Sequence, residues 1–215
     1  MSYNVNLSTI FMLQGINLEC MRGDRTLFKN INFSLESGGL MQVRGPNGSG
    51  KTSLLRILCG LAPPIYGEIL WDTNNIRSLG EKYRNAITYL GHLNGVKDDL
   101  TATENLYISS ALAGVVITKN KVHEALQQIG LSGRESLPAK VLSQGQRRRI
   151  TLARLLVCDT ALWILDEPLT ALDSSAIELL RNLLEQHLKQ GGMVVMTTHQ
   201  EITIAAIKTQ QLQLT

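Results

Sequence analysis

The chain has 215 residues, of which 44% are hydrophobic and 18% charged, and its formal net charge is +3. This composition is typical of a folded globular protein and argues against a disordered chain. The net charge is too small to indicate a nucleic-acid partner, and no apolar run reaches the ~18 residues of a membrane-spanning helix. We therefore expect a protein that binds no nucleic acid and does not cross a membrane alone. Its three cysteines, Cys20, Cys59 and Cys158, are far apart among apolar neighbours and are expected in the core.

The N-terminal part alternates short apolar segments with turns. Residues 11–20 and 31–35 lie on either side of the turn "RGDR" and predict an antiparallel β region. The segment "GGLMQVRG" predicts a short strand that ends in a glycine-rich loop. A helix is predicted next, over "KTSLLRILCGL", and it stops at Gly60. Two more strands are predicted by "GEILWD" and "NAITYLG".

After His92 the pattern changes to helical. Thr101 and Glu104 have the spacing of a capping box at the start of a helix, and two further helices are predicted over "TKNKVHEALQQIG" and "SQGQRRRITLARLLV". The strand "ALWIL", the helix "SSAIELLRNLLEQHLKQGG" and the strand "MVVMTT" follow. This alternation predicts an α/β fold with a mainly parallel sheet. We expect one domain, 1–215, with a core of residues 1–92 and 159–215 and an inserted helical subdomain, 93–158.

The segment "GPNGSGKT" fits the pattern G-x-x-x-x-G-K-[ST] and stands between a predicted strand and a predicted helix. Backbone N–H groups of such a loop, together with the helix N-terminus, bind phosphate oxygens. We expect Lys51 to contact the β and γ phosphates of a nucleotide and the Thr52 hydroxyl to bind Mg²⁺. A glycine-rich turn without a ligand is the less favoured alternative. The expected ATP-binding residues are Gly45, Pro46, Asn47, Gly48, Ser49, Gly50, Lys51, Thr52 and Ser53.

Polar side chains follow the next two apolar strands. Asp166 and Glu167 end "ALWILDE", and His199 follows "MVVMTT". Because carboxyl ends of neighbouring parallel strands face one crevice, these residues are expected near the phosphates. We expect Asp166 to hold Mg²⁺, directly or through water, and Glu167 to orient and deprotonate an attacking water. His199 is expected to contact the γ-phosphate.

A second phosphate-type helix start is predicted at "LSQGQ", which comprises Leu142, Ser143, Gln144, Gly145 and Gln146. A single chain has no evident need for two such helix ends, whereas a two-fold dimer does. We therefore expect a homodimer in which the phosphate loop of one chain faces the Ser143 helix of the other. Two ATP molecules would be held between the subunits.

The segments "GPNGSGKT", "LSQGQ", "LWILDEP", "TALD" and "TTHQ", in this order and spacing, resemble the nucleotide-binding subunit of ABC transporters over nearly the whole chain. The resemblance implies a P-loop NTPase core with an inserted helical subdomain, and ATP hydrolysis coupled to transport. It implies integral membrane subunits as partners and a peripheral position on the cytoplasmic face of the bacterial inner membrane. It also implies that Asp173 of "TALD" contacts the partner subunit near its phosphate site.

Two positions depart from the usual family pattern. His92 stands where the family usually has a glutamine, and the slot of the aromatic residue that stacks on adenine falls near Arg22. A planar guanidinium can stack on a base, and Met21 is the competing candidate. With "YLGHLNGVKDDLTATENL", these departures resemble the ATPase subunit of the cytochrome c maturation system, the haem exporter ATP-binding protein. We expect His92 at the hinge between the ATP site and the surface for the membrane partner; the alternative is an exposed histidine after a strand.

Other readings are kept as alternatives. A soluble ABC ATPase acting on ribosomes or DNA commonly has two cassettes or a long coiled-coil insertion, and neither is evident here. An exporter ATPase with another cargo is also possible on this sequence. A P-loop kinase or GTP-dependent switch leaves "LSQGQ" without a role and lacks an N-K-x-D segment. The run Arg147–Arg149 is interpreted as arginines that point in different directions, some to solvent and one to the dimer interface, rather than as a basic patch.

Overall fold

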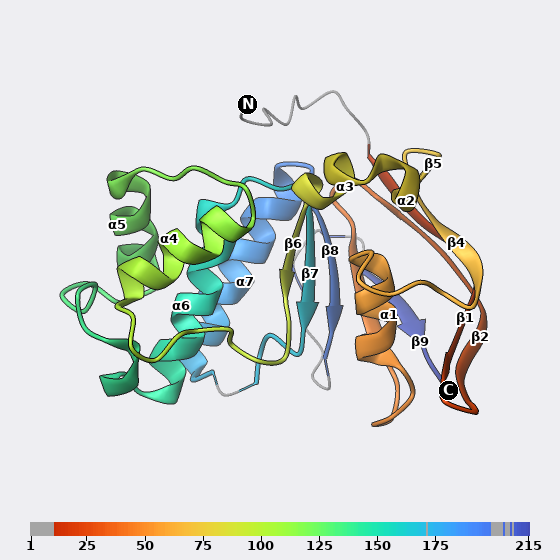
Figure 1. Cartoon of the computed structure of the whole chain (residues 1–215), viewed down its shortest axis with the longest axis horizontal. Coiled ribbons are helices and arrows are strands. Elements are labelled where there is room, and N and C mark those ends of the chain that lie inside the picture. Colours follow the sequence, from red (N-terminus) through yellow and green to blue (C-terminus); the bar gives the residue numbers. More distant parts are fainter. Residues whose placement is uncertain (1–10, 171, 199–203, 205–206, 208) are drawn as a thin grey trace. The chain divides into compact units, whose positions relative to one another are not determined.

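The computed structural model describes residues 11–170, 172–198, 204, 207 and 209–215. The chain divides into two compact units, each described here by itself. The sheet unit contains the described residues up to Tyr89, Thr160–Pro168 and the described residues from Leu184 onward. The helical unit contains Leu90–Asp159 and the described residues of Leu169–Leu183. Figure 1 shows the course of the chain and the labels of its elements.

The sheet unit begins with an antiparallel sheet of order β2-β1-β4-β5. Strand β1 (Met12–Arg22) pairs with β2 (Arg25–Glu36) and with β4 (Tyr66–Trp71), and β4 pairs with β5 (Asn74–Asn75). This confirms the antiparallel β region that the sequence predicts. The short helices α2 (Ile76–Leu79) and α3 (Glu81–Ala86) come next along the chain, and no sequence pattern had indicated them.

A second sheet has the order β6-β7-β8-β3-β9. Its strands are β3 (Leu40–Arg44), β6 (Ile87–Leu90), β7 (Leu162–Asp166), β8 (Met193–Thr197) and β9 (Thr209–Gln213). Strand β3 pairs in parallel with β8 and β9, and β7 pairs in parallel with β8. Every residue of β7 and β8 is buried, as continuous apolar runs in a parallel sheet require. The carboxyl ends of β3, β7 and β8 therefore lie at the same edge of the sheet.

Helix α1 (Lys51–Leu58) packs against β7 and β8. Its fully buried Leu54, Leu55 and Leu58 join Ile164 and Val195 in one apolar core. The same core continues into the antiparallel sheet of the unit. Because this core fixes α1 on the parallel sheet, the loop before α1 is held at the edge where β7 and β8 end.

The helical unit is built from α4 (Ala102–Leu112), α5 (Lys119–Gln128) and α6 (Gln144–Val157), which pack against one another (Figure 1). The short 3₁₀ helix η1 (Ala139–Val141) precedes α6, and α7 (Ser174–Lys189) begins in this unit. The predicted capping box at Thr101 and Glu104 is present. The apolar core of the unit includes Leu106, Leu126, Ile129, Ile150 and Ala153. In the described part of the chain, no helix is long and apolar enough to cross a membrane.

Candidate functional site

The loop between β3 and α1 is shaped for an anion. Gly50 is the N-cap residue of α1 and has φ 96°, a left-handed conformation that glycine adopts without strain. At Gly45 a Cβ atom would lie 2.6 Å from the Leu214 carbonyl oxygen, so only glycine fits this close approach. Among the described residues, no side chain caps α1 and its first turn has no acidic residue. The N–H groups at this helix end are therefore available to a negatively charged ligand.

Two buried polar side chains, Lys51 and Ser49, lie at this loop. Lys51 is only 7% exposed, and its Nζ donates to the carbonyl oxygens of Gly45 at 2.8 Å and Pro46 at 3.1 Å. Ser49 is 6% exposed, and its Oγ has no hydrogen-bond partner in the described part of the chain. A buried polar atom without a partner destabilises the fold. Phosphate oxygens at this loop would give both side chains charged acceptors, so the residues fit a nucleotide.

Asp166 is held by two threonines at the end of β7. The Thr52 hydroxyl donates to Asp166 Oδ2 at 2.8 Å, and the Thr197 hydroxyl donates to Asp166 Oδ1 at 2.7 Å. Thr197 Oγ1 also accepts a hydrogen bond from the Glu167 backbone N–H at 2.8 Å. Asp166 and Thr197 are both buried. The phosphate-loop helix and the ends of two neighbouring strands thus share one hydrogen-bonded network.

Thr197 is a residue of this network that the sequence reasoning missed. The segment "TTHQ" had been interpreted only for His199. The pairing of the two strands reveals its role. Strands β7 and β8 run in parallel with Asp166 opposite Thr197, so the Thr197 hydroxyl reaches the Asp166 carboxylate. His199 itself lies outside the described residues, and its contact with the γ-phosphate stays a prediction.

Glu167 follows Asp166 in a strained backbone conformation. Its φ is 48°, a left-handed value that costs a non-glycine residue about 1–2 kcal/mol. The hydrogen bond from its N–H to Thr197 stabilises this turn. Such strain is often found where the backbone must present a side chain for function. The half-buried Glu167 therefore has a fixed backbone position directly after the carboxylate at the end of β7.

The oxygen atoms of Thr52 and Asp166 are the type of ligand that Mg²⁺ prefers. Magnesium is usually bound by one or two protein oxygens together with substrate phosphates, rather than by an all-protein cage. The donor set therefore fits a metal ion that arrives with a nucleotide. When bound, such an ion neutralises charge on the transferring phosphoryl group.

In the helical unit, "LSQGQ" forms the N-terminus of α6. Ser143 is the N-cap: its Oγ accepts from the Gln146 backbone N–H at 3.2 Å, and its own N–H donates to Gln146 Oε1 at 3.0 Å. Leu142 is buried in the core of the unit, whereas Ser143 and Gln144 are exposed. The segment thus presents a capped helix end to the surface, with Gly145 in its first turn.

The Asp173 carboxylate accepts hydrogen bonds from groups of its own chain. Its Oδ1 accepts from the Ala176 backbone N–H at 2.8 Å, from the Ser175 hydroxyl at 2.8 Å and from Arg149 Nη2 at 3.1 Å. These donors lower the pKa of the Asp173 carboxyl, the hydrogen bond from Ala176 having the largest effect. Asp173 therefore starts α7 and is joined to α6 through Arg149.

The structure also describes the remaining predicted residues, and their surroundings do not show whether they contact a nucleotide. His92 is exposed in the loop after β6. Arg22 ends β1 opposite Arg25 and is exposed, and Met21 beside it is 38% exposed. Burial raises the pKa of the Cys20 thiol on β1, and the nearby Ser53 hydroxyl on α1 partly opposes this effect. Both adenine-stacking candidates thus lie at an exposed strand end, and the choice between them stays open.

The chain is similar in sequence to a known family and to curated proteins. Residues 28–170 match the model of the ABC transporter family. The cytochrome c biogenesis ATP-binding export protein CcmA of Nitrosospira multiformis is 71% identical over 94% of this chain and 98% of that protein. The protein of the same name from Nitrosomonas europaea is 61% identical over 96% of this chain and 97% of that protein.

Solved structures agree. A putative ABC transporter ATP-binding protein from Pyrococcus furiosus superimposes with a TM-score of 0.81 at 26% identity, covering 94% of this chain and 97% of that chain. An ATP-binding cassette solved as a dimer in a post-hydrolysis state, bound to ADP and Pi, gives a TM-score of 0.74 at 25% identity, covering 87% of this chain and 88% of that chain. The chain therefore belongs to the ABC transporter family, within the group of cytochrome c biogenesis ATP-binding export proteins, and it is an ATPase.

Proposed function

We propose that this ATPase drives a membrane complex that exports a component required for cytochrome c biogenesis, with haem as the candidate cargo. The names of the relatives with 71% and 61% identity support this assignment. The observation that carries the chemical part is the network of Thr52, Asp166 and Thr197 beside the phosphate loop, because it joins the groups that phosphoryl transfer needs.

In this proposal, the loop from Gly45 to Ser53 binds the phosphates of ATP, and Lys51 moves its ammonium donors from loop carbonyls to the β and γ phosphates. Thr52 and Asp166 hold Mg²⁺. Glu167 orients a water molecule and accepts its proton, as a carboxylate directly after the metal-binding residue is placed to do. His199 contacts the γ-phosphate. The base of ATP stacks on Arg22 or Met21 at the end of β1.

Two copies of the chain bind two ATP molecules between them. The exposed N-terminus of α6 supports this, because the positive end of a helix dipole attracts a phosphate. A dimeric cassette of the same fold, solved with ADP and Pi, also supports it. Each nucleotide would contact the phosphate loop of one subunit and Ser143 of the other, with Asp173 near the same interface.

Integral membrane subunits are the proposed further partners, and the ATPase would act as a peripheral protein on the cytoplasmic face of the bacterial inner membrane. His92 would lie at the hinge between the ATP site and the surface that these subunits contact. A neutral imidazole has one donor and one acceptor nitrogen, so it can replace the amide of a glutamine at that point.

The test replaces the chromosomal gene by Lys51→Ala and measures c-type cytochromes by haem staining of membrane proteins. We expect their loss, with normal levels when wild-type protein is restored. A tagged wild-type chain should also recover integral membrane proteins from detergent-solubilised membranes. Normal c-type cytochromes in the variant would contradict the export role. Recovery of ribosomes or DNA in place of membrane proteins would favour the soluble alternative.

A further inference from the structure

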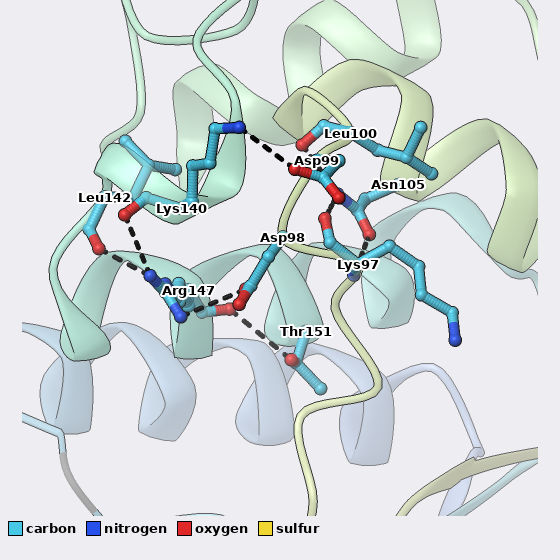
Figure 2. Close-up of polar contacts among 9 residues, drawn as sticks. All are labelled: Lys97, Asp98, Asp99, Leu100, Asn105, Lys140, Leu142, Arg147 and Thr151. Atoms are coloured by element: carbon cyan, nitrogen blue, oxygen red, sulfur yellow. Dashed lines mark hydrogen bonds and ion pairs between the residues drawn. The ribbon is translucent and has the colours of Figure 1, made fainter.

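Within the helical unit, two segments that are distant in sequence run side by side (Figure 2). The entry segment, Lys97–Thr101, leads into α4, and the signature loop, Pro138–Leu142, leads into Ser143 and α6. Backbone hydrogen bonds join the two, from Lys140 N to Asp98 O at 2.9 Å and from Ala139 N to Leu100 O at 2.8 Å. The path of one segment therefore depends on the path of the other.

A buried amide on α4 fixes the entry segment. Asn105 is 7% exposed, and its Oδ1 accepts from the Lys97 N–H at 2.7 Å. Its Nδ2 lies within donating distance of the carbonyl oxygens of Lys97, Leu100 and Thr101, at 3.0, 3.2 and 2.9 Å. One side chain thus contacts backbone groups of Lys97, Leu100 and Thr101 and gives the Lys97 N–H its acceptor in this irregular stretch.

Arg147 on α6 joins both segments. Its Nη1 donates to Asp98 Oδ1 at 3.0 Å, its Nη2 to the Lys140 carbonyl oxygen at 2.9 Å, and its Nε to the Leu142 carbonyl oxygen at 3.2 Å. Figure 2 shows these contacts converging on the guanidinium. The rigid planar fork of arginine suits such a set of acceptors, which a single ammonium group does not match.

The contacts of Arg147 with the signature loop matter more than its ion pair. The side chains of Arg147 and Asp98 are 29% and 59% exposed, and ion pairs of this kind contribute little to stability. The carbonyl groups of Lys140 and Leu142, by contrast, receive hydrogen bonds from a charged donor directly before Ser143. The neighbouring pair Lys140–Asp99 joins the same two segments only through exposed side chains.

The next turns of α6 hold the residues just before the entry segment. The Thr151 hydroxyl donates to the Asn94 carbonyl oxygen at 3.0 Å, and Arg148 Nη1 donates to Asn94 Oδ1 at 3.0 Å. Arg148 is 3% exposed. Together with Arg147, these side chains attach the loop after His92 to α6, the helix that Ser143 caps.

We propose that Arg147 is a positioning residue for Ser143. It fixes the signature loop to the entry segment, so that the exposed end of α6 has its binding shape before nucleotide and a second subunit arrive. A displacement of the stretch after His92 would then move Ser143 with it. The inference rests on the proposed dimer in one respect. Substitution of Arg147 should weaken ATP-dependent dimerisation and should not change the affinity of a subunit's own phosphate loop for ATP.

The first experiment measures dimerisation with Mg-ATP by sedimentation in a Glu167→Gln background, and ATP affinity of the monomer with a fluorescent nucleotide. Arg147→Met keeps the length of the aliphatic stem and removes the donors. We expect it to weaken dimerisation about tenfold, as the loss of charged hydrogen bonds implies, without changing monomer affinity. Arg147→Lys should recover part of the loss. The matched control Lys140→Met removes only the exposed ion pair and should behave like the parent.

The second experiment does not depend on the dimer. Hydrogen exchange of residues 142–146 in the nucleotide-free monomer should be faster in Arg147→Met than in the parent, and unchanged in Lys140→Met. Equal exchange in all three proteins would overturn the inference, as would parent-like dimerisation of Arg147→Met. So would a parallel loss of monomer ATP binding and thermal stability, since that shows a general folding role. A Glu167→Gln parent that stays monomeric with ATP contradicts the proposed dimer, while the exchange result still decides the role of Arg147.

Discussion

The hydroxyl of Thr52 donates to Asp166 Oδ2 at 2.8 Å, although the two residues are 114 positions apart in sequence. This hydrogen bond joins the first turn of α1 to the end of β7. Both residues were predicted to bind Mg²⁺, and the fold brings them into direct contact. The same carboxylate is held from its other side by Thr197. The parallel sheet and the packing of α1 on it therefore hold these two proposed metal ligands in place before any ion binds.

Lys51→Ala is expected to lower ATP turnover at least ~100-fold, because the developing charge on the phosphoryl group loses its cation. The measurement is phosphate release at saturating ATP. Lys29→Ala is the control: Lys29 is exposed and pairs only with Glu19 among the described residues. Turnover of Lys51→Ala within a few-fold of the control would show that this loop is not the catalytic phosphate site.

Thr197→Val is expected to lower kcat about tenfold with a small change in KM, because it removes the hydroxyl that holds both Asp166 and the Glu167 backbone. The substitution keeps the shape of the buried side chain. Thr197→Ser keeps the hydroxyl and should retain most of the activity. Steady-state kinetics of both variants test this; equal activity of the valine and serine variants would mean that the network does not contribute to catalysis.

Ser143→Arg should prevent ATP-driven dimerisation and leave nucleotide binding by the monomer intact. The reason is geometric: the exposed end of α6 serves the nucleotide of the other subunit in the proposed dimer. Dimerisation and monomer binding are measured separately, by sedimentation and by fluorescent-nucleotide titration. An equal loss in both assays would place Ser143 at the nucleotide of its own chain.

Stability should fall in acid because of His187. Its ring stacks on Trp163 at 3.8 Å between centroids, and burial lowers its pKa from 6.5 to about 4. Between these values the unfolded chain binds a proton that the folded chain does not bind. The free energy of unfolding therefore decreases as pH falls from 6.5 towards 4, by about 3 kcal/mol in total.

Urea denaturation between pH 7 and pH 4 measures this loss. His187→Phe keeps an aromatic ring beside Trp163 and should flatten the dependence, although it also loses the hydrogen bond to the Met193 carbonyl oxygen. His123→Gln is the control, since His123 is exposed. If His187→Phe shows the same slope as wild type, other groups cause the acid sensitivity.

Local patterns predicted much of this fold. The capping box at Thr101 and Glu104 depends on residues three positions apart, so the sequence shows it directly. Strand β9 was missed because it lies at a sheet edge, where its alternating exposed residues "TQQLQ" give no apolar run. The helices α2 and α3 were missed because they are short.

In the site, too, features with a local sequence pattern were predicted and features that depend on the fold were not. The phosphate loop and the acids after β7 are contiguous in sequence and were found there. The role of Thr197 depends on the register of β7 against β8, which no local pattern reveals. The arginine run from Arg147 to Arg149 was interpreted as pointing in different directions. The structure shows that two of them contact Asp98 and Asn94 in the loop after β6, while Arg149 contacts Asp173 at the start of α7.

The most direct test of the account is the mass of Glu167→Gln measured by light scattering with and without Mg-ATP. The variant keeps the side-chain shape but lacks the proposed base, so it should bind ATP without hydrolysing it. The account predicts twice the 23.7 kDa of one chain with ATP, and 23.7 kDa without nucleotide or when Ser143→Arg is added. A single-chain mass under every condition, with ATP demonstrably bound, would contradict an ATP site shared between two subunits.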